Sequence, residues 1–136
     1  QVKGLLRGGM SAWAKEGLPI DHICLISAGE LFEICKSGRD TVLLDVRSKD
    51  EFSAGHIDRA VNIPAPELRT RHAELEKDRP IAVICTTGNR SGMACSILKM
   101  NGFKKVYNVT GGMTGYTAAG YFAQLPVCAA PHLPKI

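Results

Sequence analysis

Five short apolar segments recur along the chain and predict the strands of one sheet. They cover residues 23–26, 41–46, 60–63, 81–84 and 105–109. Residues 41–46 form an almost continuous apolar run with β-branched side chains, which is typical of a strand covered on both faces. Because such strands occur in parallel sheets, we expect a mainly parallel five-stranded sheet.

Helical patterns separate the apolar segments. Ser27 and Glu30 have the spacing of a capping box and predict a helix that ends at Ser37-Gly38. Further helices are expected near residues 51–52, 64–77 and 91–101. The alternation predicts an α/β domain, doubly wound with right-handed crossovers and with helices on both faces of the sheet.

A segment near the start of the chain is similar to one near its end. Residues 8–17 and 111–120 both begin with Gly-Gly-Met and continue with a hydroxyl, an aromatic and a glycine residue at matching places, at an offset of 103 residues. Since this offset is about the size of one domain, we interpret residues 1–20 as the tail of a preceding, similar domain. Residues 21–125 would then form the domain itself and residues 126–136 a C-terminal tail. An ordinary N-terminal extension is the alternative.

Length and composition limit the classes of function. A chain of 136 residues with 45% hydrophobic residues can bury one continuous core. The net charge of +4 is scattered without a dense basic run, which argues against nucleic-acid binding and mildly favours small anionic substrates. No apolar run approaches the roughly 20 residues that cross a bilayer. We therefore expect no membrane association and a cytoplasmic location.

The cysteines stand far apart, at positions 24, 35, 85, 95 and 128. No Cys-x-x-Cys pair points to zinc or dithiol chemistry, so we expect reduced thiols, no metal and no cofactor. Cys85 is distinctive because it follows the apolar run 81–84 directly, at the sheet edge where open parallel sheets bind ligands. Whether Cys95 or Cys128 takes part in redox chemistry stays open.

Residues 85–91, here called the nucleophile loop, have features that would activate a thiol. Loop N–H groups and the positive end of the following helix can point at the sulfur and lower its pKa. Gly88 permits the positive φ that a tight loop needs, and Arg90 ends the loop with a planar cation suited to an oxyanion. We predict that Cys85 is catalytic rather than a buried small hydrophobe. The predicted cradle for its persulfide anion comprises Thr86, Thr87, Gly88, Asn89, Arg90 and Ser91.

Three stretches, residues 43–64, 85–91 and 106–113, resemble the rhodanese family. The resemblance implies a rhodanese-like fold and a sulfurtransferase in which Cys85 takes a sulfane sulfur from glutathione persulfide or thiosulfate and passes it to a thiophilic acceptor. It implies a small sulfur-containing substrate. With the repeat, it also implies an upstream domain of the same polypeptide, either a further rhodanese domain or a metallo-β-lactamase-like persulfide dioxygenase.

The resemblance also implies supporting roles for three residues. Asp45 would brace the nucleophile loop, and Arg47 and Glu51 would form an ion pair beside it. A surface salt bridge and a strand-end cap are the plainer interpretation of these residues. His56 lies in a turn whose family counterpart is mainly structural, so we do not expect it to act as a general base.

Two other functions remain open. Phosphatases and arsenate reductases related to the family place five residues between Cys and Arg, whereas four separate Cys85 from Arg90. The tighter ring suits one sulfur atom better than a phosphate. A non-catalytic rhodanese module that binds or regulates a partner is the second alternative. For the sulfurtransferase, the uncharged Thr86 and Thr87 favour a persulfide donor over thiosulfate.

Overall fold

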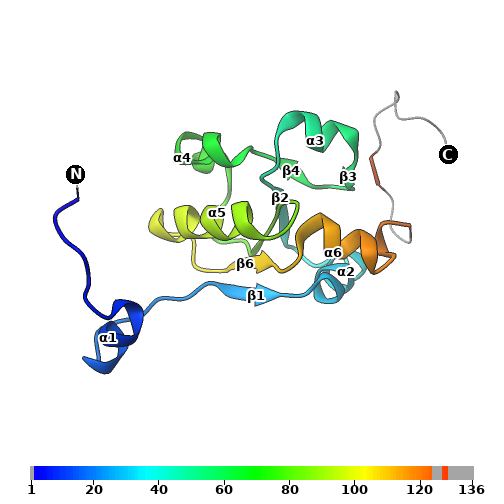
Figure 1. The fold of residues 1–136 in the computed structure, drawn as a ribbon. Coiled ribbons are helices and arrows are strands. Elements are labelled where there is room, and N and C mark those ends of the chain that lie inside the picture. Colours follow the sequence, from blue (N-terminus) through cyan, green and yellow to red (C-terminus); the bar gives the residue numbers. More distant parts are fainter. Residues whose placement is uncertain (1, 124–126, 129–136) are drawn as a thin grey trace.

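A five-stranded parallel sheet forms the centre of the domain (Figure 1). The computed structural model describes residues 2–123 and 127–128. The strand order is β1-β6-β5-β2-β4, and every neighbouring pair is parallel, as the apolar runs predict. These strands are β1 (Cys24–Ile26), β2 (Val42–Asp45), β4 (Val61–Asn62), β5 (Ile81–Ile84) and β6 (Val106–Val109).

Helices cover both faces of the sheet, which confirms the predicted α/β architecture (Figure 1). One face carries α2 (Ala28–Lys36) and α6 (Gly112–Ala118), and the other carries α4 (Leu68–Arg71) and α5 (Asn89–Met100). Successive residues of a strand point to opposite faces. Ile84 therefore packs with α2 and α6, whereas Cys85 belongs to the cluster under α4 and α5.

Two capping boxes begin helices close to the site. Ser27 and Glu30 form the predicted box at the start of α2, with the Ser27 N–H donating to the Glu30 carboxylate at 2.7 Å. A second box, formed by Ser48 and Glu51, begins α3 (Lys49–Ala54). In this box the Ser48 N–H donates to the Glu51 carboxylate at 3.0 Å. The position of Glu51 is therefore held by a local contact with Ser48, three residues away in the sequence.

The segment after β4 does not form the single helix predicted over residues 64–77. It is divided into η1 (Ala65–Glu67), α4 and η2 (His72–Glu74). Pro64 and Pro66 have no N–H to donate and favour a tight turn, in which the Glu67 N–H donates to the Pro64 carbonyl at 2.8 Å. Leu68 is fully buried in the core, so packing determines the direction of α4.

The end of the chain contains elements that the sequence did not predict. α6 follows β6, where only a closing turn was expected, and η3 (Tyr121–Ala123) comes next. Two short strands, β3 (His56–Ile57) and β7 (Val127–Cys128), pair antiparallel. β7 lies within the predicted C-terminal tail, and residues 126 and 129–136 of that tail lie outside the described part of the chain.

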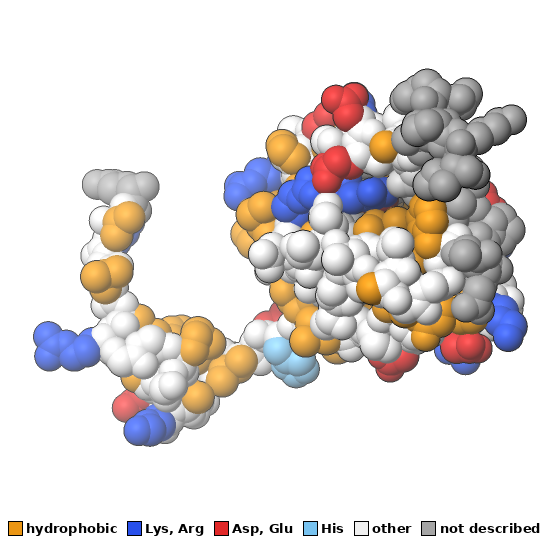
Figure 2. All heavy atoms as spheres, turned by 45° about the vertical axis from the view of Figure 1, so that its right-hand side comes forward, with side chains coloured by type: hydrophobic (Ala, Val, Ile, Leu, Met, Phe, Trp, Pro, Cys, Tyr) orange, Lys and Arg blue, Asp and Glu red, His pale blue; other side chains and the backbone are white. Residues whose placement is uncertain are grey.

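The N-terminal segment stands apart from the sheet (Figure 1). It contains α1 (Gly9–Lys15), none of whose residues is buried. Figure 2 shows hydrophobic side chains along this projecting arm. The large apolar residues exposed on it are Val2, Leu5, Leu6, Met10, Leu18 and Ile20. The segment thus contributes nothing to the core. Among the helices of residues 2–123 and 127–128, none is long and apolar enough to cross a bilayer.

Candidate active site

Cys85 lies where the central strand β5 ends and the nucleophile loop begins, as the sequence predicts. Gly88, with φ of 109°, is the N-cap of α5, so the chain turns from strand to helix within a few residues. This left-handed conformation favours glycine. The loop curls around the Cys85 side chain, and the residue is only 1% exposed.

The loop directs hydrogen-bond donors at the sulfur. The Gly88 N–H donates to Cys85 Sγ at 3.1 Å, and Ser91 Oγ lies 3.3 Å from the same atom. Burial on its own raises the pKa of the Cys85 thiol, but hydrogen bonds from Ser91, Gly88 and Thr87 more than reverse this and leave the pKa lowered. The loop therefore favours the thiolate.

Asn108 is a member of this network that sequence reasoning missed. The Ser91 hydroxyl has one proton, which it donates to Asn108 Oδ1 at 2.6 Å and can turn towards the sulfur 3.3 Å away when Cys85 is a thiolate. Asn108 Nδ2 donates to the Gly88 carbonyl at 3.2 Å. The side chain thus holds both groups that contact the sulfur. The sequence feature that could have indicated this role is a polar residue, Asn108, within the otherwise apolar strand 106–109.

Replacing Ser91 with alanine is expected to raise the pKa of Cys85, because a hydrogen bond to the thiolate is lost while burial remains. The rate of alkylation by iodoacetamide should then rise at a higher pH than in the wild type, whose pKa lies below the ordinary 9.0. Ser96→Ala is the control, since the Ser96 hydroxyl lies in the same helix and donates to the Gly92 carbonyl. Equal profiles for Ser91→Ala and wild type would contradict the role of this hydroxyl.

Glu51 and Arg90 form an ion pair across the loop. Both guanidinium nitrogens Nη1 and Nη2 lie 2.8 Å from the Glu51 carboxylate, and the Thr86 hydroxyl donates to it at 2.9 Å. The Arg90 guanidinium holds the pKa of Glu51 far below its usual range. The sequence analysis predicted that Arg90 would suit a bound oxyanion. In the structure, the charge of Arg90 is instead neutralised by the Glu51 carboxylate.

The Arg47–Glu51 ion pair implied by the family resemblance is not formed. Arg47 instead donates through Nε and Nη2 to Asp45, with Nη2 2.7 Å from the carboxylate. Asp45 is fully buried, so its charge requires a close partner, and Arg47 is two residues away on the same strand end. Glu51 rather than Asp45 makes the hydrogen bonds to the nucleophile loop.

Replacing Asp45 with alanine is expected to reduce the free energy of unfolding by about 3–5 kcal/mol, because Arg47 would be left with an uncompensated charge inside the fold. Urea denaturation followed by circular dichroism measures the loss. Asp40→Ala is the matched control, since Asp40 pairs with Arg79 at 2.6 Å on the surface with a side chain that is 79% exposed. Equal losses in the two variants would refute a special role for the buried pair.

The start of α6 holds the nucleophile loop from the other side. Backbone N–H groups of Met113 and Thr114 donate to the carbonyls of Cys85 and Thr86 at 2.8 and 3.0 Å. A Cβ on Gly112 would collide with the Cys85 carbonyl oxygen. Because α6 binds the carbonyls of Cys85 and Thr86, these carbonyls point away from the sulfur. The N–H groups of the loop are then the backbone groups that face the sulfur.

An open hollow of about 570 Å³ lies beside the loop, between α3 and α6. Glu51 borders it, together with Thr114, Thr117 and Phe122. The exposed Thr87 and Asn89 form the outer surface of the loop. Arg47 also lines the hollow, with its guanidinium bound to Asp45. A donor approaching here would therefore meet hydroxyl groups, one carboxylate and one paired cation.

The other thiols lie away from this network. Cys95 is fully buried, and burial raises the pKa of its thiol to about 12. Cys24 is exposed and Cys35 is partly buried; nothing is described for the Cys128 side chain. The His56 Nδ1–H group donates to the Phe52 carbonyl oxygen at 2.8 Å, in keeping with a structural role. Within the described residues, no group of three His, Cys, Asp or Glu side chains could hold a metal ion.

Family comparison matches residues 27–119 to the model of the rhodanese-like domain. The match includes the nucleophile loop, the Asp45–Arg47 and Glu51–Arg90 pairs, and α6. It therefore contains every residue described above that contacts Cys85 or the nucleophile loop.

Individual proteins and structures are similar to the same region. The putative sulfur carrier protein YrkF of Bacillus subtilis is 44% identical over 75 residues, 55% of this chain and 40% of that protein. A sulfurtransferase of Allochromatium vinosum is 33% identical over 90 residues, 66% of this chain and 80% of that protein. A crystal structure of a rhodanese-related protein from Thermoplasma volcanium matches with a TM-score of 0.67 and 36% identity, covering 76% of this chain and 96% of that one. The chain spans only 40% and 59% of the length of YrkF and of a second Bacillus subtilis relative, YqhL.

Proposed function

Because the chain belongs to the rhodanese-like domain family, we propose that it transfers a sulfane sulfur from a small donor to a thiophilic acceptor through a persulfide on Cys85. Similarity to a sulfurtransferase and to a putative sulfur carrier supports sulfur transfer in general. The observation that carries the proposal is the cradle around the thiol, with the Gly88 N–H 3.1 Å from Sγ at the start of α5.

The reaction proceeds in two displacements. The Cys85 thiolate attacks the outer sulfur of a persulfide R–S–SH; a Cys85–S–SH bond forms, the donor S–S bond breaks, and the donor thiolate leaves with the electron pair. An acceptor thiolate then attacks the outer sulfur and releases the Cys85 thiolate. The N–H groups that stabilise the thiolate also stabilise the persulfide anion, so no general base is required.

The same geometry disfavours the phosphatase alternative. A phosphate in the loop would need a free cation, but the Arg90 guanidinium is bound by Glu51 and by the Thr86 hydroxyl. Hydrolysis of para-nitrophenyl phosphate should therefore stay at the level of a Cys85→Ser variant.

Glutathione persulfide is expected to be a better donor than thiosulfate. The two cations near the hollow are both paired with protein carboxylates, Arg47 with Asp45 and Arg90 with Glu51, so the dianionic thiosulfate meets no unpaired cation among the residues that line it. Measuring kcat/KM for both donors with cyanide as acceptor tests this expectation. A higher value for thiosulfate would contradict it.

Mass spectrometry tests the function itself. Incubation with glutathione persulfide should add one sulfur atom to the peptide that contains Cys85, and a thiol acceptor should remove it. If neither donor ever loads Cys85, the protein is a non-catalytic rhodanese module rather than an enzyme.

A further inference from the structure

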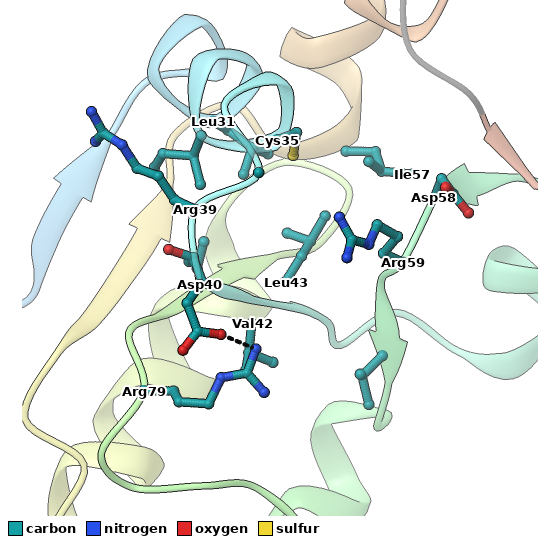
Figure 3. A pocket seen from close by; sticks show the side chains of 15 residues that line it. Leu31, Cys35, Arg39, Asp40, Val42, Leu43, Ile57, Asp58, Arg59 and Arg79 are labelled. Carbon is teal, nitrogen blue, oxygen red and sulfur yellow. Dashed lines mark ion pairs between the residues drawn. The ribbon is translucent and has the colours of Figure 1, made fainter.

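Figure 3 shows the side chains that line a cavity of about 380 Å³. Its buried apolar residues belong to the cluster on the face of the sheet opposite the Cys85 side chain. It opens between α2, the beginnings of β2 and β5, and the turn after β3. Its apolar lining includes Leu31, Leu43, Ile57 and Ala82. None of its lining residues belongs to the nucleophile loop, so it is a separate feature of the fold.

Arg59 projects into this cavity from a strained backbone. The turn is closed by the Ala60 N–H, which donates to the Ile57 carbonyl at 3.1 Å, and Arg59 occupies its third position with φ of 68°. Glycine is the preferred residue at such a position. Among the described non-glycine residues, only Arg59 has a positive φ. Figure 3 shows its guanidinium reaching from the turn towards Leu43.

The positive charge of Arg59 acts within the cavity. Arg79 is paired with Asp40 at 2.6 Å, whereas Arg59 forms no ion pair with a carboxylate of residues 2–123. Burial raises the pKa of the Cys35 thiol in the cavity wall, and the charge of Arg59 partly offsets that rise. Arg39 also lines the cavity and forms no ion pair with a carboxylate of residues 2–123, but Figure 3 shows it pointing away from Leu43. Arg59 is therefore the unpaired cation that faces the apolar floor.

We propose that this cavity binds a small organic anion, with its apolar part on Leu31 and Leu43 and its carboxylate or sulfonate on Arg59. The volume lies within the range of about 300–1,000 Å³ that is usual for small-molecule sites. Retention of an arginine at a position that favours glycine is consistent with this role, because backbone strain concentrates at ligand-binding positions.

The test uses 8-anilinonaphthalene-1-sulfonate, which has an apolar body and one sulfonate. Wild type should bind one equivalent, with changes in amide NMR signals at Ala82 and Ile57 but not at Gly88.

Arg59→Gly should weaken binding about tenfold or more, by loss of a charge-assisted contact, while the melting temperature rises because the turn is relaxed. Arg59→Lys keeps the charge and should retain part of the affinity. Undiminished binding in Arg59→Gly, or changes centred on Gly88, would overturn the proposal.

A second inference rests on the repeat, independently of the cavity. α1 and α6 are both seven residues long and are related by the same offset of 103 residues. Their N-cap glycines, Gly8 and Gly111, have φ of 82° and 75°, and the next glycines, Gly9 and Gly112, have φ of 59° and 54°. The similarity of the two segments therefore extends from sequence to backbone conformation.

The surroundings of the two helices differ. In α6, Met113 is 7% exposed and Tyr116 is fully buried, whereas their counterparts in α1 are Met10, which is 61% exposed, and Trp13, which is only partly buried. Gly112 lies against the nucleophile loop with no room for a Cβ, while nothing lies within 4 Å of the Cβ position at Gly9. α1 has the features with which α6 docks, but none of its residues is buried, and its Trp13 indole N–H donates to the Pro19 carbonyl of the same arm.

We infer that α1 is the closing helix of a second unit of the same fold, encoded before residue 1 of this chain, and that it packs on that unit's own loop. Met10 and Trp13 would then occupy the buried positions that Met113 and Tyr116 occupy here. The exposed Leu5 and Leu6 precede them on the same arm and would be covered with them.

Hydrogen exchange measured by mass spectrometry tests this inference. In the 136-residue chain, residues 8–17 should exchange rapidly and residues 111–120 slowly. In the natural polypeptide extended upstream by about one domain length, both segments should be protected.

Substitution at Gly9 provides the specific variant. In the extended polypeptide, Gly9→Ala should remove protection from residues 8–17 without changing sulfur transfer at Cys85. Gly4→Ala, at a glycine with no neighbours within 4 Å and no positive φ, is the control. Rapid exchange of residues 8–17 in the extended polypeptide would overturn the inference. Protection that appears only with dimerisation of the 136-residue chain would do the same.

Discussion

Replacing Cys85 with serine is expected to reduce sulfur transfer by roughly a thousandfold or more, since a serine hydroxyl is not ionised by the loop and forms no persulfide. The loss should appear in kcat with both donors. Serine differs from cysteine by one atom, and the Gly88 N–H that contacts Sγ can still donate to an oxygen. The fold should therefore survive, and the melting temperature of Cys85→Ser should stay close to that of wild type.

The remaining cysteines provide the control for this substitution. Cys24→Ser changes an exposed thiol outside the site and should leave the rate unchanged. Cys95 should not substitute for Cys85, because a thiol with a pKa of about 12 is protonated at neutral pH. Persulfide formation that continues in Cys85→Ser would place the reactive sulfur elsewhere and reject the proposed mechanism.

Replacing Gly112 with alanine is expected to have the second largest effect. The new Cβ would meet the carbonyl oxygens of Cys85 and Thr86, and the φ of 54° disfavours any side chain. Together these effects should destabilise the fold by about 2–4 kcal/mol. Displacement of the loop should reduce sulfur transfer in the folded fraction by about a hundredfold, since small misplacements of reacting groups are costly.

Gly115→Ala is the matched control for this substitution. Gly115 lies in the same helix, and a Cβ there would be 3.7 Å from the Thr110 carbonyl oxygen, an ordinary contact. Alanine also has the higher helix propensity. Thermal denaturation and persulfide loading of both variants separate a general effect on α6 from an effect on the loop. If Gly112→Ala loads Cys85 as fast as Gly115→Ala, the contact between α6 and the loop has no role in catalysis.

Both substitutions probe one arrangement, in which the protein directs N–H groups at the sulfur and binds the loop carbonyls elsewhere. The thiolate is held by hydrogen bonds and by the start of α5, while the nearby cation Arg90 is neutralised by Glu51. The entrance to the nucleophile loop therefore carries no unpaired charge among the residues named here. This is consistent with a sulfur donor that carries little charge at the reacting atoms.

Local patterns were sufficient to predict the five strands of the parallel sheet, the capping box at Ser27 and the position of Cys85 at a strand end. These features depend on residues only a few positions apart, such as the alternation along a strand or the contact between Ser27 and Glu30. The break in residues 64–77 was missed because the buried Leu68 contributes through its core contacts rather than through helix propensity.

The partners of the charged residues were decided only by the tertiary structure. Glu51 and Arg90 are 39 positions apart, and they meet because the ends of β2 and β5 are neighbours in the sheet. Asn108 joins Ser91 and Gly88 for the same reason, since β6 lies beside β5. By itself, the sequence determined which thiol stands at the carboxyl edge of the sheet. Strand order determined which side chains surround that thiol, because hydrogen bonds and ion pairs form between atoms that the fold brings within about 3 Å.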